Sequence, residues 1–127
     1  MATAYKTKGK IDAFTTGGAI RKYRIVKWST AADNTILETD AEEVSCGISI
    51  DAAGTSGDVI KIQRDGIAKV EAGGSMTRGD WFNSDADGKA VTESTTNKWA
   101  SGKVLQSADN GDIISVDLDM TGYISTT

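Results

Sequence analysis

The side chains of this sequence that could do chemistry are carboxylates, hydroxyls and one thiol, because the chain contains no histidine. Without histidine it lacks the commonest general base and the commonest neutral metal ligand. Cys46 has no imidazole to activate its thiol, so we expect a small buried residue rather than a nucleophile. A single cysteine also excludes an intramolecular disulfide and a cysteine-rich zinc site.

The carboxylates stand mainly in turn sequences, where an aspartate bonds its own backbone. Asp85-Ala86-Asp87-Gly88 resembles the start of a calcium loop, but it lacks the later ligands, so a tight turn is the better interpretation. Arg78-Gly79-Asp80 matches a cell-adhesion tripeptide, yet its last two residues repeat the form of Gly57-Asp58 and Gly111-Asp112. A structural role explains all three sites, and we expect no enzyme, no metal and no cofactor.

The elements that must position these residues follow from a pattern that occurs twice, in residues 47–62 and 102–118. Each copy is a glycine, a short apolar strand, a turn containing alanine, then Gly-Asp and a β-branched strand. Two such units predict an all-β fold, a small single-domain β-barrel or sandwich of short antiparallel hairpins. The chain has no proline, so glycine and aspartate must make the turns. The expected structural turn residues are Gly57, Asp58, Gly66, Gly88, Gly111 and Asp112.

Three strand predictions can be tested directly. Residues 19–28 form the first clear strand, and residues 98–107 pair with 112–120 in the last hairpin. Residues 59–71 form a hairpin with a three-residue loop ending at Gly66, because this register pairs Ile62 with Ala68 and keeps one face apolar. Gly66 would then be left-handed.

Tryptophans are the largest candidate anchors. Trp28, Trp81 and Trp99 are expected in the core by default, and an exposed one would indicate an interface hot spot.

Charge is divided unevenly along the chain. Residues 1–30 carry a net charge of +6 and residues 31–127 a net charge of −10, which together give −4. We expect residues 1–13 to form an extended basic arm on a single β domain of residues 14–127. The candidate partner-binding residues of the arm are Tyr5, Lys6, Lys8 and Lys10. The charge split fits a solvated basic face as well as a partner such as nucleic acid, an acidic protein patch or a second copy.

Nucleic acid is the least favoured of these partners, because the body is acidic and few aromatic residues accompany the basic run. We expect no direct nucleic-acid binding. No apolar run reaches 18 residues, so no membrane span is expected. The first residues lack the apolar stretch of a signal peptide, which predicts synthesis and folding in a cytoplasm.

An ordered set of glycine, aspartate and apolar positions carries a family resemblance. The set comprises Gly17-Gly18-Ala19, Cys46-Gly47-Ile48, Gly57-Asp58-Val59, Gly66, Gly79-Asp80-Trp81, Asp85 to Lys89, Gly102-Lys103-Val104 and Gly111-Asp112-Ile113. Over residues 11–120 the chain resembles the small decoration, or cement, proteins on the capsids of tailed bacteriophages. It departs from them in the basic arm, in the insertion 31–43 and in Trp81, where a smaller apolar residue is more usual.

The resemblance implies a structural virion protein that binds the outer surface of the phage head and stabilises the major capsid lattice. It implies the major capsid protein as partner, a homotrimer on the capsid, and residues 1–13 as a capsid-facing arm that adds a strand to a sheet edge. The alternative is a virion surface binding module, such as a head-fibre base or a glycan-binding protein. An exposed tryptophan in a cleft would favour that alternative.

Overall fold

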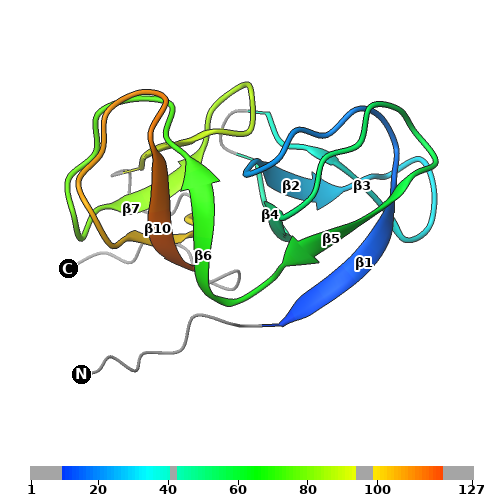
Figure 1. Cartoon of the computed structure of the whole chain (residues 1–127), viewed down its shortest axis with the longest axis horizontal. Helices are drawn as coiled ribbons and strands as arrows, with labels where there is room; N and C mark the ends of the chain where they lie inside the picture. The colour runs from blue at the N-terminus through cyan, green and yellow to red at the C-terminus, as the bar shows by residue number, and fades with distance from the viewer. Residues whose placement is uncertain (1–9, 41–42, 94–98, 119–127) are drawn as a thin grey trace.

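Short strands and tight turns build the whole of the chain that the computed structural model describes, namely residues 10–40, 43–93 and 99–118 (Figure 1). The N-terminal half contains β1 (Ile11–Thr16), β2 (Ile25–Trp28), β3 (Thr35–Glu38), β4 (Gly47–Ser49) and β5 (Val59–Gln63). The C-terminal half contains β6 (Gly66–Glu71), β7 (Trp81–Ser84), β8 (Ala90–Thr92), β9 (Gly102–Val104) and β10 (Ile113–Leu118). These residues include no helix, and the all-β prediction is confirmed.

The two halves have the same topology and lie side by side in Figure 1. The N-terminal strands close into a barrel in the order β1-β3-β2-β4-β5, and the C-terminal strands follow the equivalent order β6-β10-β9-β7-β8. Every paired set of strands in the first sheet has a counterpart in the second. The parallel β1–β3 contact that closes the barrel corresponds to one parallel bridge between Ala72 and Ala90. The fold is therefore an internal repeat of a five-stranded unit.

One turn occurs four times, twice in each half. An isolated antiparallel bridge residue is followed by a tight turn whose third or fourth residue has a left-handed backbone, and a strand then begins. The bridges join Ile20 to Ala53 and Met76 to Ala108. The left-handed residues are Tyr23 (φ 63°), Gly57 (90°), Gly79 (93°) and Gly111 (93°). The two sequence copies 47–62 and 102–118 are confirmed as equivalent units, because they form β4–turn–β5 and β9–turn–β10.

Alternating burial gives each half its apolar interior. In β5 and β10 every second side chain is buried, namely Ile60, Ile62, Ile114, Val116 and Leu118, and of the residues between and beside them only Gln63 at the end of β5 is also buried. Ile25 and Ile48 of the N-terminal half pack in the core of the C-terminal half. This shared core joins the halves into one domain.

Two strand predictions are wrong, and one is confirmed. Gly66 has a left-handed φ of 76°, but β5 pairs with β1 and β4 whereas β6 pairs with β10. The segment 64–66 therefore carries the chain from one half to the other and closes no hairpin. Residues 19–28 are not one strand, because the chain turns at Tyr23 and β2 begins at Ile25. The last hairpin is confirmed, with Val116 opposite Val104.

Candidate functional site

The predicted arm meets the barrel at Lys10. Tyr5, Lys6 and Lys8 lie outside the described residues. The Lys10 carbonyl accepts a hydrogen bond from the Arg64 amide at 2.8 Å, and the exposed Lys10 ammonium lies 4.0 Å from Asp12. Residues 11–13 already belong to β1 and pair with β5. The part of the chain that can reach outward as an arm is therefore shorter than residues 1–13.

Several aspartates in the predicted turns accept hydrogen bonds from backbone amides of the same turn. Asp80 accepts a hydrogen bond from the Thr77 amide at 2.9 Å, and Asp112 accepts the equivalent bond from the Asp109 amide at 3.0 Å. Asp85 likewise accepts from two amides in the turn that contains Gly88, whose φ is 76°. Within the described ranges, no group of three or more His, Cys, Asp and Glu side chains could hold a metal ion. Turn formation accounts for these carboxylates.

An exposed aromatic cluster lies beside the root of the arm. Trp28, at the end of β2, is 43% exposed, although Val26 on the same face of that strand is fully buried. The ring of Phe14 from β1 meets Trp28 edge-on, with the ring centroids 4.8 Å apart. The Arg64 guanidinium lies 5.4 Å from the Trp28 ring centroid, a cation–π distance, and 3.3 Å from Asp12. These contacts fix Trp28 at the open end of the barrel.

A hollow of about 740 Å³ opens beside the Trp28 ring. Its apolar lining includes Trp28, Ala31, Leu37 and Val44, and Val44 is 55% exposed. On its rim, Lys27 donates to both oxygens of Glu43 at 2.7 and 2.9 Å. These hydrogen bonds lower the pKa of Glu43 below its ordinary value. We call Phe14, Trp28, Val44 and Arg64, together with this hollow, the aromatic surface.

The other two tryptophans are more enclosed than Trp28. Trp99 is 7% exposed and donates its Nε1–H to the Ser45 hydroxyl at 3.1 Å. Trp81 is half-buried under Lys103, whose ammonium lies 4.6 Å from its ring centroid. Core placement is thus confirmed for Trp99 and wrong for Trp28. The sequence signal for Trp28 was its position at a strand end before the small and polar residues 29–34.

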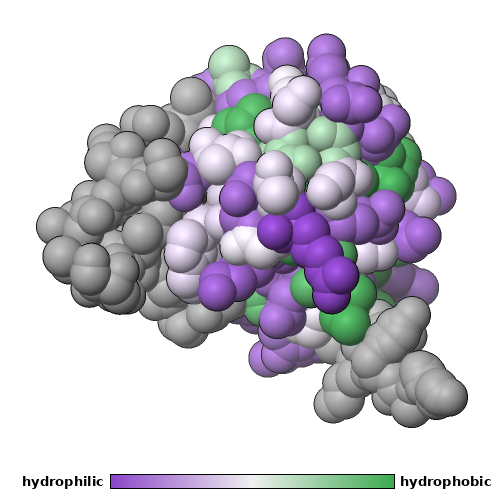
Figure 2. Space-filling model, turned by 90° about the vertical axis from the view of Figure 1, so that its left-hand side faces the viewer, coloured by the Kyte–Doolittle hydropathy of each residue, from purple (hydrophilic) through white to green (hydrophobic). Residues whose placement is uncertain are grey.

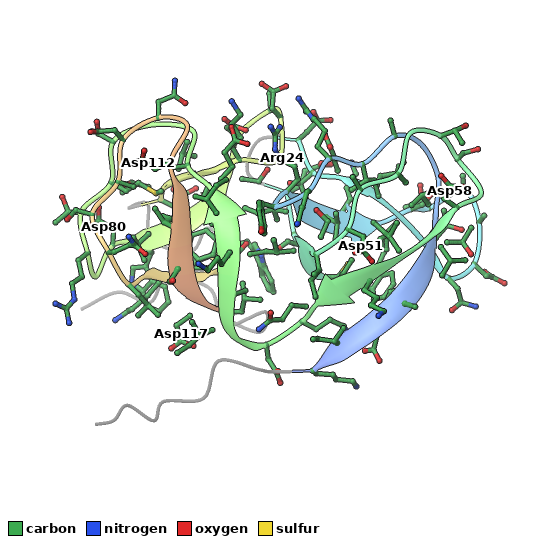
Figure 3. The ribbon with its side chains drawn as sticks, in the orientation of Figure 1. Arg24, Asp51, Asp58, Asp80, Asp112 and Asp117 are labelled. Carbon is green, nitrogen blue, oxygen red and sulfur yellow. The ribbon has the colours of Figure 1, made fainter. Side chains whose placement is uncertain are left out.

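A polar joint holds the two halves together, and sequence reasoning missed it. Arg24 is 6% exposed and spans the halves, with its Nη2 3.1 Å from Glu71 Oε1 and its Nη1 donating to the Asp87 carbonyl at 3.0 Å. The equivalent position in the other three turns is an aspartate, namely Asp58, Asp80 or Asp112. Figure 3 shows these three at the outer margins and Arg24 between the halves. One departure from the repeat therefore makes the joint.

A second ion pair borders this joint, because Arg21 also donates to the Asp87 carbonyl, at 3.3 Å. The nearby pair of Arg21 and Glu38 has an N–O distance of 2.8 Å. Burial raises the pKa of Glu38, but the hydrogen bonds and charge of Arg21 outweigh burial and leave that pKa below its ordinary value.

On the face of the molecule where β5 leads to β6, two neighbouring hollows of about 590 and 260 Å³ form a groove between the halves. Its lining includes Ile67, Leu105 and the Gln63 amide, which donates to two backbone carbonyls.

The single thiol is placed in the core. Cys46 is 4% exposed, and burial raises its pKa to about 12. A thiol with that pKa is almost wholly protonated at neutral pH and makes a poor nucleophile.

Comparison with known proteins gives a likeness to solved structures. No known protein family and no curated protein matches this sequence. Among solved structures, the fold is similar to that of the head fiber gp8.5 N base of bacteriophage phi29, with a TM-score of 0.74 and 17% sequence identity. The likeness covers 92% of this chain and 100% of that chain. At this identity it shows a shared fold over nearly the whole chain. In the part of the chain that the structure describes, no helix is long and apolar enough to cross a membrane.

Proposed function

We propose that this chain is a structural protein of a phage virion that binds the outer surface of the head and stabilises the major capsid lattice. The observation that carries the proposal is the fold shared with a head-fibre base over 92% of this chain. The ordered glycine and aspartate positions, which resemble phage decoration proteins, support it from an independent direction.

The chemistry of the chain supports a structural role rather than an enzymatic one. The thiol is buried with a raised pKa, and several aspartates hold turns. A protein that staples neighbouring capsid subunits needs a rigid body and contact surfaces, and many weak contacts repeated over a lattice give large avidity. The N-terminal barrel and the C-terminal sheet, which share a core, supply the rigid body. The basic arm and the aromatic surface next to it supply contacts.

We propose the major capsid protein as the partner and a homotrimer on the capsid as the assembly. The described barrel begins at Lys10, and the arm residues before Lys10 would contact a neighbouring subunit. In the closed N-terminal barrel, each strand already has two neighbours, so this barrel offers no edge to which a strand could be added.

A second candidate function is a surface binding module such as the base of a head fibre. The same structural likeness favours it, and so does the exposed Trp28 beside its hollow. In that case the chain would anchor a larger appendage and add little to the strength of the head. The two functions differ in what the head loses when the protein is absent.

A phage that lacks the gene would test both functions. If the protein is a cement, mutant heads will release their DNA at a lower temperature, and adding the purified protein will restore heat resistance. Heads that keep full heat resistance but lack a visible appendage would support the fibre base. Heads unchanged in both respects would refute the proposed function.

A further inference from the structure

We infer that the free edge of β6, in the groove between the halves, binds an extended loop of the major capsid protein by pairing with the main chain of that loop. The inference rests on the proposed function, because it takes the loop from the head to which this chain binds. It places a main-chain contact on the C-terminal half, apart from the arm.

The direction of the backbone hydrogen bonds identifies the free edge. Ser115 of β10 lies opposite Lys69 of β6, but its carbonyl accepts a hydrogen bond from the Leu105 amide on the β9 side, at 3.1 Å. Ser115 and Lys69 are therefore a non-hydrogen-bonded pair of the antiparallel ladder, in which each backbone points away from the other strand. The backbone N–H and C=O groups of Lys69 thus point away from β10, as do those of Ile67 and Glu71 two residues away. This edge of β6 faces the N-terminal half (Figure 1).

Two groups of the N-terminal half already pair with the ends of this edge. The Gln63 side-chain amide donates to the Ile67 carbonyl at 2.8 Å, and the Glu71 amide donates to the Tyr23 carbonyl at 3.0 Å. Gln63 and Tyr23 thus take the places that a neighbouring strand would fill. Between them, no hydrogen bond from the residues that the structure describes reaches the outward N–H or C=O of Lys69. An extended segment supplies both an acceptor and a donor at the spacing that these two groups require.

The shape of the edge favours a loop over a second folded body. A strand spans about 13 Å from residue 67 to residue 71, which leaves room for about three extended residues between Gln63 and Tyr23. A straight strand at the edge of another copy of this chain would collide with Gln63 and Tyr23 before it reached Lys69. The tip of an extended loop can enter the groove from its open side.

The lining of the groove indicates a loop with uncharged, apolar side chains. The hollow of about 260 Å³ beside the edge is bordered by Ile11, Ile48 and Ile50, and Ile11 is 44% exposed. Among the described residues that line the two hollows, Lys69 is the only charged one. An apolar side chain of the loop would cover Ile11 and remove its surface from water. The end of the C-terminal half is different, because Figure 2 shows only small separate apolar patches among polar residues there.

Lys69→Pro tests the edge itself. Proline removes the outward N–H and puts a ring in its place, while every hydrogen bond between β6 and β10 remains. The matched control is Lys69→Ala, which removes the charge and keeps the N–H. Binding of both variants to purified expanded heads that lack this protein would be measured, with circular dichroism showing that each is folded. We expect Lys69→Pro to weaken binding about tenfold or more, and Lys69→Ala to bind as the wild type does.

Ile11→Glu tests the hollow, with Ile113→Glu as its matched control. Ile11 is 44% exposed and Ile113 is 43% exposed, but only Ile11 lines the groove. A carboxylate at position 11 would meet the apolar side chain of the loop without a partner for its charge. We expect Ile11→Glu to weaken binding to the same heads and Ile113→Glu to leave it unchanged.

Hydrogen exchange of the wild-type protein, read by mass spectrometry with fragmentation, decides the matter if Lys69→Pro does not fold. In the free protein the Lys69 amide should exchange about a hundredfold faster than the Ala68 and Val70 amides, which pair with β10. On the heads, exchange at Lys69 should slow by about tenfold or more.

The outcomes distinguish the edge contact from head binding. If the wild type binds heads but the Lys69 amide exchanges equally fast on them, or if all four variants bind as the wild type does, the edge contact is wrong while head binding stands. If Lys69→Ala weakens binding as much as Lys69→Pro, the charge makes the contact and the edge does not. If the Lys69 amide is protected in concentrated protein without heads and exposed on dilution, a second copy occupies the edge and the capsid loop is wrong. If the wild type binds no heads, the proposed function fails and the edge contact fails with it.

Discussion

Arg24 reaches out of the N-terminal half to Glu71 in the C-terminal half, with Nη2 and Oε1 3.1 Å apart. The same guanidinium donates to the Asp87 carbonyl at 3.0 Å. Arg24 stands where the three equivalent turns have an aspartate. The joint between the halves therefore depends on the one turn whose residue at this position differs from the others. Tyr23 before it replaces a glycine, and its carbonyl accepts a hydrogen bond from the Glu71 amide at 3.0 Å.

The first prediction concerns this joint. Arg24→Ala should lower the free energy of unfolding by about 2–4 kcal/mol, because it removes the cross-half donor to Glu71 and leaves the Asp87 carbonyl with only the longer hydrogen bond from Arg21, at 3.3 Å. The control is Lys22→Ala in the same turn, which should stay within about 0.5 kcal/mol of the wild type because Lys22 is exposed. Urea unfolding measures both, and equal losses would show that Arg24 contributes no more than a surface cation.

The second prediction separates backbone strain from steric overlap at two glycines. Gly111 has a φ of 93° with open space around it, so Gly111→Ala should cost about 1–2 kcal/mol through strain alone. A Cβ at Gly102 would overlap the Asp117 carbonyl across the β9–β10 pair. Gly102→Ala should therefore cost more than about 4 kcal/mol or prevent folding. Thermal unfolding of the two variants compares them, and similar melting temperatures would count against the β9–β10 pairing.

The third prediction concerns acid pH. The pKa of Glu38 is lower in the fold than its ordinary value of 4.5, so its ionised form stabilises the fold above that value. This contribution is lost as the pH falls through the lower pKa of the folded state. Glu38→Gln should reduce stability at pH 7 and make the decline between about pH 5 and pH 2 less steep. Asp33→Asn, at an exposed carboxylate after β2, is the control for an acidic side chain without that partner. If stability declines as steeply at acid pH in Glu38→Gln as in the wild type, Glu38 does not make this contribution.

The fourth prediction concerns the thiol. Because burial raises the pKa of Cys46 to about 12, native protein at pH 8 should react with a thiol reagent at least a hundredfold more slowly than protein unfolded in guanidinium. Absorbance at the reagent's product wavelength follows both reactions. Fast labelling of the folded protein would place Cys46 outside the core.

The sequence was sufficient for the class of fold and for part of its repeat. The Gly-Asp pattern identified the equivalent units at Gly57 and Gly111, because their left-handed positions nearly require glycine. It also marked Gly79-Asp80 as a site of the same form, but it did not reveal the fourth equivalent turn, since Tyr23 and Arg24 replace Gly-Asp there. A weaker signal was present in Gly17-Gly18-Ala19-Ile20 and Gly73-Gly74-Ser75-Met76, which hold the same place in the two halves.

The pairing of the strands was harder to predict than the strands themselves. The apolar alternation of residues 59–71 is real, but it fits a hairpin and a crossing between two sheets equally well. Only the pairing of β5 with β1 and of β6 with β10 decides between them, and these pairings join residues far apart in sequence. The aromatic surface was missed for a related reason, because whether Trp28 is buried depends on what covers the end of the barrel.

The fifth prediction concerns the arm. Deleting residues 2–9 should leave the melting temperature within about 2 °C of the wild type, because the described ladder begins at Lys10. The same deletion should weaken binding to expanded heads at least tenfold and flatten its salt dependence, since Lys6 and Lys8 are removed. Unchanged binding by the folded, truncated protein would show that the arm makes no contact with the head.

Co-sedimentation of the purified protein with expanded, undecorated heads is the most direct test of whether this chain binds the outside of a phage head. We expect saturable binding at a copy number that matches the symmetry of the head, in multiples of three for a trimer. Failure of the folded wild-type protein to sediment with the heads, at concentrations well above those found in an infected cell, would contradict it.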